Sequence, residues 1–128
     1  MLAGSVPASA VDHHANSCLG STVTPGHTSI GSTQRTINYD GTPAMRGGVY
    51  LNLNTTSYCT GAFPGGTMHI NIVKCSNNAT ISTERSFTAG SKDKYIATNV
   101  LPTTCFKVRW RGSTAGSFKG VIFWWVKL

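Results

Sequence analysis

Acidic residues are scarce in this 128-residue chain, which has four Asp and Glu against eleven Lys and Arg and a formal net charge of +7. Acid–base catalysis needs two ionisable groups in different environments, commonly two carboxylates or a histidine with an acid. Asp12, Asp40 and Asp93 fall in predicted arm or turn segments, and Glu84 alone lies in a predicted strand. No carboxylate pair of the glycosidase type can be nominated. We therefore expect a protein that is not an enzyme.

Motifs for serine nucleophiles and for zinc are also absent. The chain has no G-x-S-x-G motif, and it has no C-x-x-C pair of the kind found in zinc ribbons and thioredoxin-type sites. No run approaches the roughly 18 apolar residues that a transmembrane helix needs. We expect no cofactor and no transmembrane segment.

The first ten residues read like the end of a secretory signal peptide, with the A-x-A cleavage pattern at residues 8–10. We therefore expect a secreted protein and exclude residues 1–10 from the domain. Cleavage after Ala10 would place Val11, Asp12 and His13 at the new amino terminus. The free amine, two backbone amides and the His13 imidazole would then offer Cu(II) or Ni(II) a tetragonal set of nitrogen donors. The alternative is an arm without a metal role.

The cysteines form an even, widely spaced set, which in an exported chain predicts two disulfides. They are Cys18, Cys59, Cys75 and Cys105. Three connectivities are possible. We favour Cys18–Cys59 with Cys75–Cys105, because Cys75 closes one predicted strand and Cys105 opens another, as antiparallel neighbours would place them.

Apolar and polar side chains alternate over residues 49–54, 68–73 and 104–111, which is the period of half-buried strands. No segment shows a helical period. The strands at 49–54 and 68–73 are predicted to pair as a hairpin, and a further strand is predicted at 80–88. Residues 118–128 are apolar on both faces, which indicates a strand buried on both sides or one with an exposed aromatic surface.

About seven or eight strands separated by turns predict one all-β domain over residues 28–128. The expected architecture is an antiparallel β-sandwich, Ig-like or jelly-roll-like, with two disulfides. A small β-barrel is the alternative. Residues 11–27 are rich in Ser, His and Gly, and we expect them to form an extended N-terminal arm held at Cys18.

A cationic strand face is the leading candidate for a binding surface. Alternation over residues 104–111 predicts a core face of Phe106, Val108 and Trp110 and an outer face of Lys107, Arg109 and Arg111. The net positive charge draws the molecule toward polyanions. Such a face suits an anionic cell-surface polymer. Single-stranded nucleic acid would use a similar combination of charge and stacking, but export and the buried position predicted for Trp110 argue against it.

Exposed aromatic side chains would add recognition of sugars, because aromatic faces stack on sugar rings. The candidates are Tyr58, Phe63 and Trp125. The loop at residues 59–66, tethered by a predicted disulfide, is the expected recognition surface. We therefore predict a secreted, non-enzymatic module that binds an anionic or glycan-bearing cell surface.

A protein–protein interaction component is the alternative function. The apolar segment at residues 121–128 would pair with another subunit or with the sheet edge of a partner, unless it is a central core strand. The loop at 59–66 is a second candidate contact. On this hypothesis the protein is a subunit of an extracellular assembly, an inhibitor or an antimicrobial toxin.

Overall fold

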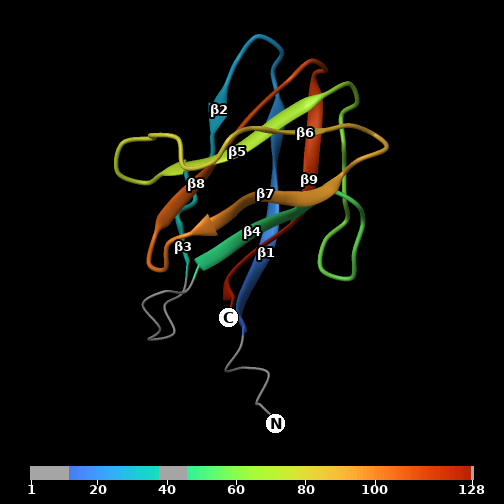
Figure 1. Ribbon diagram of the computed structural model, residues 1–128. Coiled ribbons are helices and arrows are strands. Elements are labelled where there is room, and N and C mark those ends of the chain that lie inside the picture. Colours follow the sequence, from blue (N-terminus) through green and yellow to red (C-terminus); the bar gives the residue numbers. More distant parts are fainter. Residues whose placement is uncertain (1–11, 38–45, 128) are drawn as a thin grey trace.

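The computed structural model of the chain describes the backbone of residues 12–37 and 46–127 and the side chains of residues 15–37 and 46–124 (Figure 1). This part of the chain contains strands, turns and bends, and no helix. The strands are β1 (Asp12–Val23), β2 (Ser29–Ile30), β3 (Arg35–Thr36), β4 (Arg46–Asn52), β5 (Met68–Lys74), β6 (Arg85–Phe87), β7 (Asp93–Val100), β8 (Cys105–Gly112) and β9 (Gly116–Lys127). The predicted all-β class is confirmed.

The strands form two antiparallel sheets that pack face to face. The first sheet has the order β1-β9-β4-β7, and the second has the order β2-β8-β5-β6, with β3 also paired to β8. The chain is one long hairpin wound on itself, because its antiparallel pairs are nested along the sequence. From the outermost to the innermost they are β1·β9, β2 and β3 with β8, β4·β7 and β5·β6. This is the arrangement of a jelly roll, in which two sheets remain open at their edges and do not close into a barrel.

The hairpin predicted between the strands at 49–54 and 68–73 is wrong. Strands β4 and β5 lie in different sheets, and residues 53–67 cross from one sheet to the other. Alternation identifies which face of a strand is buried, but it carries no information about the neighbouring strand. Each strand pairs instead with a later part of the chain, β4 with β9 and β7, and β5 with β8 and β6.

The segment predicted as an extended arm contributes strand β1, which pairs with β9 without a register shift from Asp12–Lys127 to Val23–Gly116. Strand β9 therefore lies between β1 and β4 and is a central strand. The neighbouring residues Val121 and Ile122 are both fully buried, so β9 is covered on both faces there, whereas Phe123 on its outer face is only partly buried.

The core lies between the sheets and contains side chains from both. The predicted core face of β8 is confirmed, since Phe106, Val108 and Trp110 are 0%, 1% and 5% exposed. The largest fully buried side chains of the other strands and loops include Ile37, Leu51, Leu53, Met68, Ile70, Ile72, Phe87, Ile96, Phe118 and Ile122. The predicted strand at 80–88 is shorter in the structure, where only β6 at residues 85–87 is a strand.

Both preferred disulfides are present, Cys18–Cys59 and Cys75–Cys105. The second joins β5 to the start of β8, and the backbone N–H of Cys75 also donates to the carbonyl of Cys105 at 3.2 Å. Strands β5 and β8 are antiparallel neighbours, as predicted from the positions of Cys75 and Cys105.

A buried arginine joins the two sheets on the side where β1 and β3 lie. Arg35 is 7% exposed, and its Nη2 donates to Ser17 Oγ of β1 at 3.1 Å. Its guanidinium carbon lies 5.3 Å from the ring centroid of Trp124 of β9. Burial lowers the pKa of Arg35, and Nε is buried without a hydrogen-bond partner among the described residues. The cation–π contact with Trp124 and the hydrogen bond to Ser17 thus help to hold this charge between the sheets.

We expect removal of the Cys75–Cys105 bridge by a double alanine substitution to lower the free energy of unfolding by about 3–4 kcal/mol, because a cross-link over a separation of 30 residues restricts the unfolded chain. Urea unfolding followed by tryptophan fluorescence measures the loss. The Cys18→Ala/Cys59→Ala variant, which opens a separation of 41 residues, is expected to show a similar loss. A loss below about 1 kcal/mol in both variants would contradict the expectation.

Candidate binding surfaces

The predicted cationic residues lie together on the outer face of the second sheet. In the β5·β8 ladder, Arg109 stands opposite Asn71, and Lys107 stands opposite Val73. Arg109 Nε donates to Asn71 Oδ1 at 2.9 Å, and the fully buried Asn71 donates from Nδ2 to the carbonyl of Ser82 at 2.8 Å. Arg109 is therefore held by Asn71 of the neighbouring strand, and Asn71 is in turn held by the segment that follows β5.

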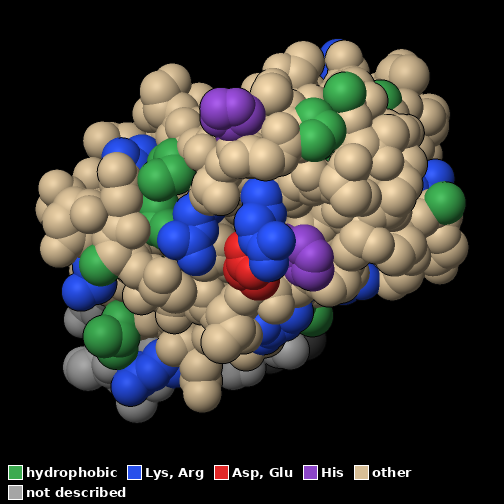
Figure 2. Space-filling model, turned by 90° about the horizontal axis from the view of Figure 1, so that it is seen from above, with side chains coloured by type: hydrophobic (Ala, Val, Ile, Leu, Met, Phe, Trp, Pro, Cys, Tyr) green, Lys and Arg blue, Asp and Glu red, His purple; other side chains and the backbone are tan. Residues whose placement is uncertain are grey.

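Arg111 is held by a carboxylate on the same face. Its Nε and Nη2 donate to the two carboxylate oxygens of Glu84 at 2.9 and 2.8 Å, the paired geometry that suits a guanidinium. The hydrogen bond from Arg111 lowers the pKa of Glu84. Figure 2 shows Lys and Arg side chains spread over the upper face of the molecule, with an acidic side chain among them. Part of the positive charge on this face is therefore neutralised within the molecule.

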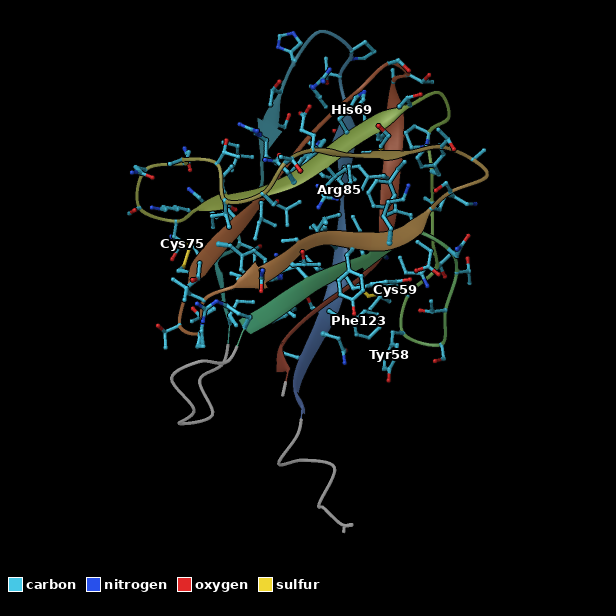
Figure 3. All side chains as sticks on the ribbon, in the orientation of Figure 1. Tyr58, Cys59, His69, Cys75, Arg85 and Phe123 are labelled. Atoms are coloured by element: carbon cyan, nitrogen blue, oxygen red, sulfur yellow. A yellow bond between two sulfur atoms is a disulfide. The ribbon has the colours of Figure 1, made fainter. Side chains whose placement is uncertain are left out.

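A second surface lies on the outer face of the first sheet and is aromatic. We call Tyr50, Tyr58, Tyr95 and Phe123 the aromatic surface. The Tyr50 ring centroid lies 5.0 Å from that of Tyr95 and 6.5 Å from that of Phe123, and the Tyr58 centroid lies 6.3 Å from that of Phe123. Figure 3 shows Tyr58 and Phe123 close together beside Cys59. Tyr58 is 63% exposed and Tyr95 37% exposed, so the surface presents large rings to solvent.

The loop after β4 holds Tyr58 in place. The Cys18–Cys59 disulfide ties the loop to β1, and Ala62 pairs with Lys119 of β9 through two backbone hydrogen bonds of 2.9 and 3.0 Å. The loop closes tightly at Gly61, where a Cβ atom would lie 2.4 Å from the Leu53 carbonyl oxygen, so only glycine fits there. A ring on such a cross-linked loop is positioned before any ligand arrives.

Tyr50 is anchored by an acid at the start of β7. A hydrogen bond to Asp93 is the largest cause that raises the pKa of Tyr50 to about 12, so its hydroxyl is the donor. This contact fixes the ring of Tyr50 between those of Tyr95 and Phe123.

The structure separates the residues that the sequence grouped as one binding site. Lys107, Arg109 and Arg111 lie on the outer face of the second sheet, and Tyr58 lies on the outer face of the first. Phe63 is partly buried and packs against the core. The backbone of Trp125 pairs with His14 and Gly48, and its side chain lies outside the described part.

Tyr95 and Phe123 were not among the predicted site residues. One feature of the sequence could have identified Phe123. It lies two residues before Trp125 on an apolar strand, and residues two apart on a strand share a face. Pairing across β9, β4 and β7 was also needed, and the sequence alone did not provide it.

The proposed copper site falls at the edge of the described part. The backbone of Asp12 and His13 pairs with Lys127 and Val126, and their side chains lie outside the described residues. The described residues contain no group of three or more His, Cys, Asp or Glu placed to hold a metal ion. In that same part of the chain, no helix is long and apolar enough to cross a membrane.

Comparisons with known proteins give one likeness of fold. No protein-family model matches the chain, and no curated protein matches it. A solved structure from Bacillus, described as "Bacillus endospore appendages form a novel family of disulfide-linked pili", is similar with a TM-score of 0.50 and 15% sequence identity. The likeness covers 92% of this chain and 89% of that chain. It therefore extends over nearly the whole of both folds.

We expect the substitution Glu84→Gln to lower the melting temperature at neutral pH but not in strong acid. The pKa of Glu84 is lowered in the folded protein, so its stabilising contribution is present above its ordinary pKa of 4.5 and is lost as the pH falls through the lowered value. Thermal unfolding of both proteins at pH 7 and at about pH 2 measures this. An equal difference at both pH values would contradict the role of the ionised pair.

Proposed function

We propose that this chain is a non-catalytic structural subunit of an extracellular protein assembly. The observation that carries the proposal is the fold shared with a chain of disulfide-linked pili over 92% of this chain and 89% of that one. The two disulfides of this chain support an oxidising, extracellular environment. A rigid, disulfide-braced β-sandwich is also a suitable building block, because little conformational entropy is lost when such bodies associate.

Contacts between copies would be non-covalent in this protein. All four of its cysteines are engaged in bridges within the chain, and none is free. The proposed subunit therefore has no spare thiol with which to cross-link a neighbour. Backbone pairing at sheet edges and side-chain packing remain as the contacts that could join copies.

Electrostatics would oppose assembly at low salt. Each copy has a formal charge of +7, so neighbouring copies repel one another, and salt screens that repulsion. The proposal therefore includes a dependence on ionic strength or on a polyanion that neutralises the charge.

We expect the purified protein to form larger species as its concentration rises, and more readily when salt is raised from about 0.01 M to about 0.15 M. Light scattering after size exclusion and electron microscopy measure the assembly. Denaturing gels without reductant are the control and should show monomers, because the copies are not joined by disulfides. A monodisperse monomer at every concentration and salt level would contradict the proposal.

A second function, binding to a surface glycan, is favoured by one observation. The aromatic surface presents Tyr58 at 63% exposure on a cross-linked loop, and its edge-to-face rings lie beside the polar side chains of Asn52 and Asp93. Exposed rings with hydrogen-bonding neighbours suit sugar rings. On this proposal the aromatic surface binds a sugar, while the cationic face of the second sheet draws the molecule toward anionic polymers.

We expect Tyr58→Ala to lower retention on insoluble cell-wall polysaccharide by about tenfold, since an exposed ring in a binding surface contributes on the order of 1–2 kcal/mol. The comparison is Lys107→Ser on the opposite face, which should lower retention only slightly at physiological salt, because salt screens the attraction of a single charge. Retention that depends on Lys107 and not on Tyr58 would assign binding to the cationic face. No retention of the wild-type protein would refute glycan binding.

A further inference from the structure

Open sheet edges carry unpaired backbone donors and acceptors, so any protein made of open sheets must protect them or use them. The first sheet has β1 and β7 at its edges, and the second has β6 on one side and β2 with β3 on the other. These edges differ in the side chains and backbone irregularities that they carry. The differences indicate which edge is available to a partner.

The edges of the second sheet are protected. Strand β6 has only three residues, and one of them, Arg85, which stands opposite the core residue Ile70, carries a charge. Strands β2 and β3 have two residues each, and β3 places the buried Arg35 between the sheets. Short edge strands and inward-pointing charges are recognised devices against pairing with another chain.

The β7 edge of the first sheet is also protected. The β4·β7 ladder contains two register shifts, and Asn99 of β7 has a φ of 61°, so the strand is irregular along its length. Lys94 carries a charge near the start of β7, and its Nζ donates to the backbone carbonyl of Ser86 and to Ser91 Oγ. Bulges and lysine side chains both disfavour the addition of a strand.

Strand β1 carries none of these devices. It is twelve residues long and pairs with β9 without a register shift. Residues 13–23 contain no Lys, Arg, Asp, Glu or Pro. Among the described residues β1 forms a ladder with β9 alone, as Figure 1 shows, where β1 runs beside β9. One side of a long, regular strand, which has no Lys, Arg, Asp or Glu after Asp12, is therefore open within the described structure.

This strand is also held rigidly by its other contacts. The Cys18–Cys59 disulfide fixes it to the loop after β4, and Arg35 donates a hydrogen bond to Ser17. Trp110 Nε1 donates to the Thr22 carbonyl at 3.0 Å. This bond occupies the edge of β1 at Thr22, and the edge from Asp12 to Ser21 remains open among the described residues. A strand fixed in this way loses little conformational entropy when another strand pairs with it.

We propose that a second copy of the chain pairs with this protein along the outer edge of β1, strand β1 against strand β1 in antiparallel orientation. Such a contact is related by a two-fold axis, so each copy supplies the same surface. Charge favours this edge over the others, because two molecules of charge +7 approach there without placing lysines or arginines of the edge strands opposite one another. The inference rests on the proposed role as an assembly subunit, and it names the surface through which two copies meet.

The test places one lysine on each edge of the same sheet. Asn16→Lys adds a charge to an exposed position of β1, and Thr98→Lys adds the same charge to an exposed position of β7. We expect Asn16→Lys to weaken dimer formation by about tenfold or more, because each copy then brings an added positive charge to the shared edge, and Thr98→Lys to leave it unchanged. Sedimentation equilibrium measures the dissociation constant, and circular dichroism checks that each variant is folded.

Hydrogen exchange on the wild-type protein gives an independent readout that needs no variant. Backbone amides of residues 12–21 that point away from β9 should become more protected on dimer formation, and those of β7 should not. Association that survives Asn16→Lys, or protection that appears on β7 instead of β1, would overturn the β1 contact while leaving the assembly role in place. A wild-type protein that stays monomeric would overturn both.

Discussion

The antiparallel pairing of β1 with β9 is the contact on which the rest of the fold depends. It joins the first described strand to the last, from Asp12–Lys127 to Val23–Gly116. All other pairs of the wound hairpin lie inside this one along the chain. The same pairing makes β9 a central strand and leaves β1 at the edge of its sheet. One pairing therefore decides both that β9 is buried in the sheet and that β1 has, among the described strands, a free edge for a partner.

Two chemically different faces follow from this arrangement. The outer face of the second sheet is polar and basic, with its arginines held by Asn71 and Glu84. The outer face of the first sheet carries the aromatic surface, positioned by the loop that the Cys18–Cys59 disulfide holds over β9. This loop also accounts for the burial of Val121, which lies opposite Cys18 in the ladder. Because the faces point in opposite directions, one compact ligand cannot contact both.

Local pattern in the sequence was sufficient for the class of fold, the inner face of β8 and both disulfides. The local pattern did not predict which strands pair, because the partner strands are distant along the chain. The alternation at 49–54 and 68–73 correctly marked buried faces, but the pairing of those strands is decided by β7, β8 and β9, which come later. The predicted binding site is split between two surfaces for the same reason. Lys107 and Tyr58 would share a surface only if the sheets placed them on the same side of the molecule, and they do not.

The nested topology also has a consequence for folding kinetics. Strand β1 is synthesised before the other described strands, but its ladder cannot form until β9, the last of them, is available. Folds dominated by such non-local pairs fold slowly, because the entropy of closing a long loop is lost before the contacts form. Cys59 becomes available much earlier than β9, so the Cys18–Cys59 bridge can hold β1 near its final position during this interval. The bridge that positions Tyr58 in the native protein would then also shorten the search for the last strand.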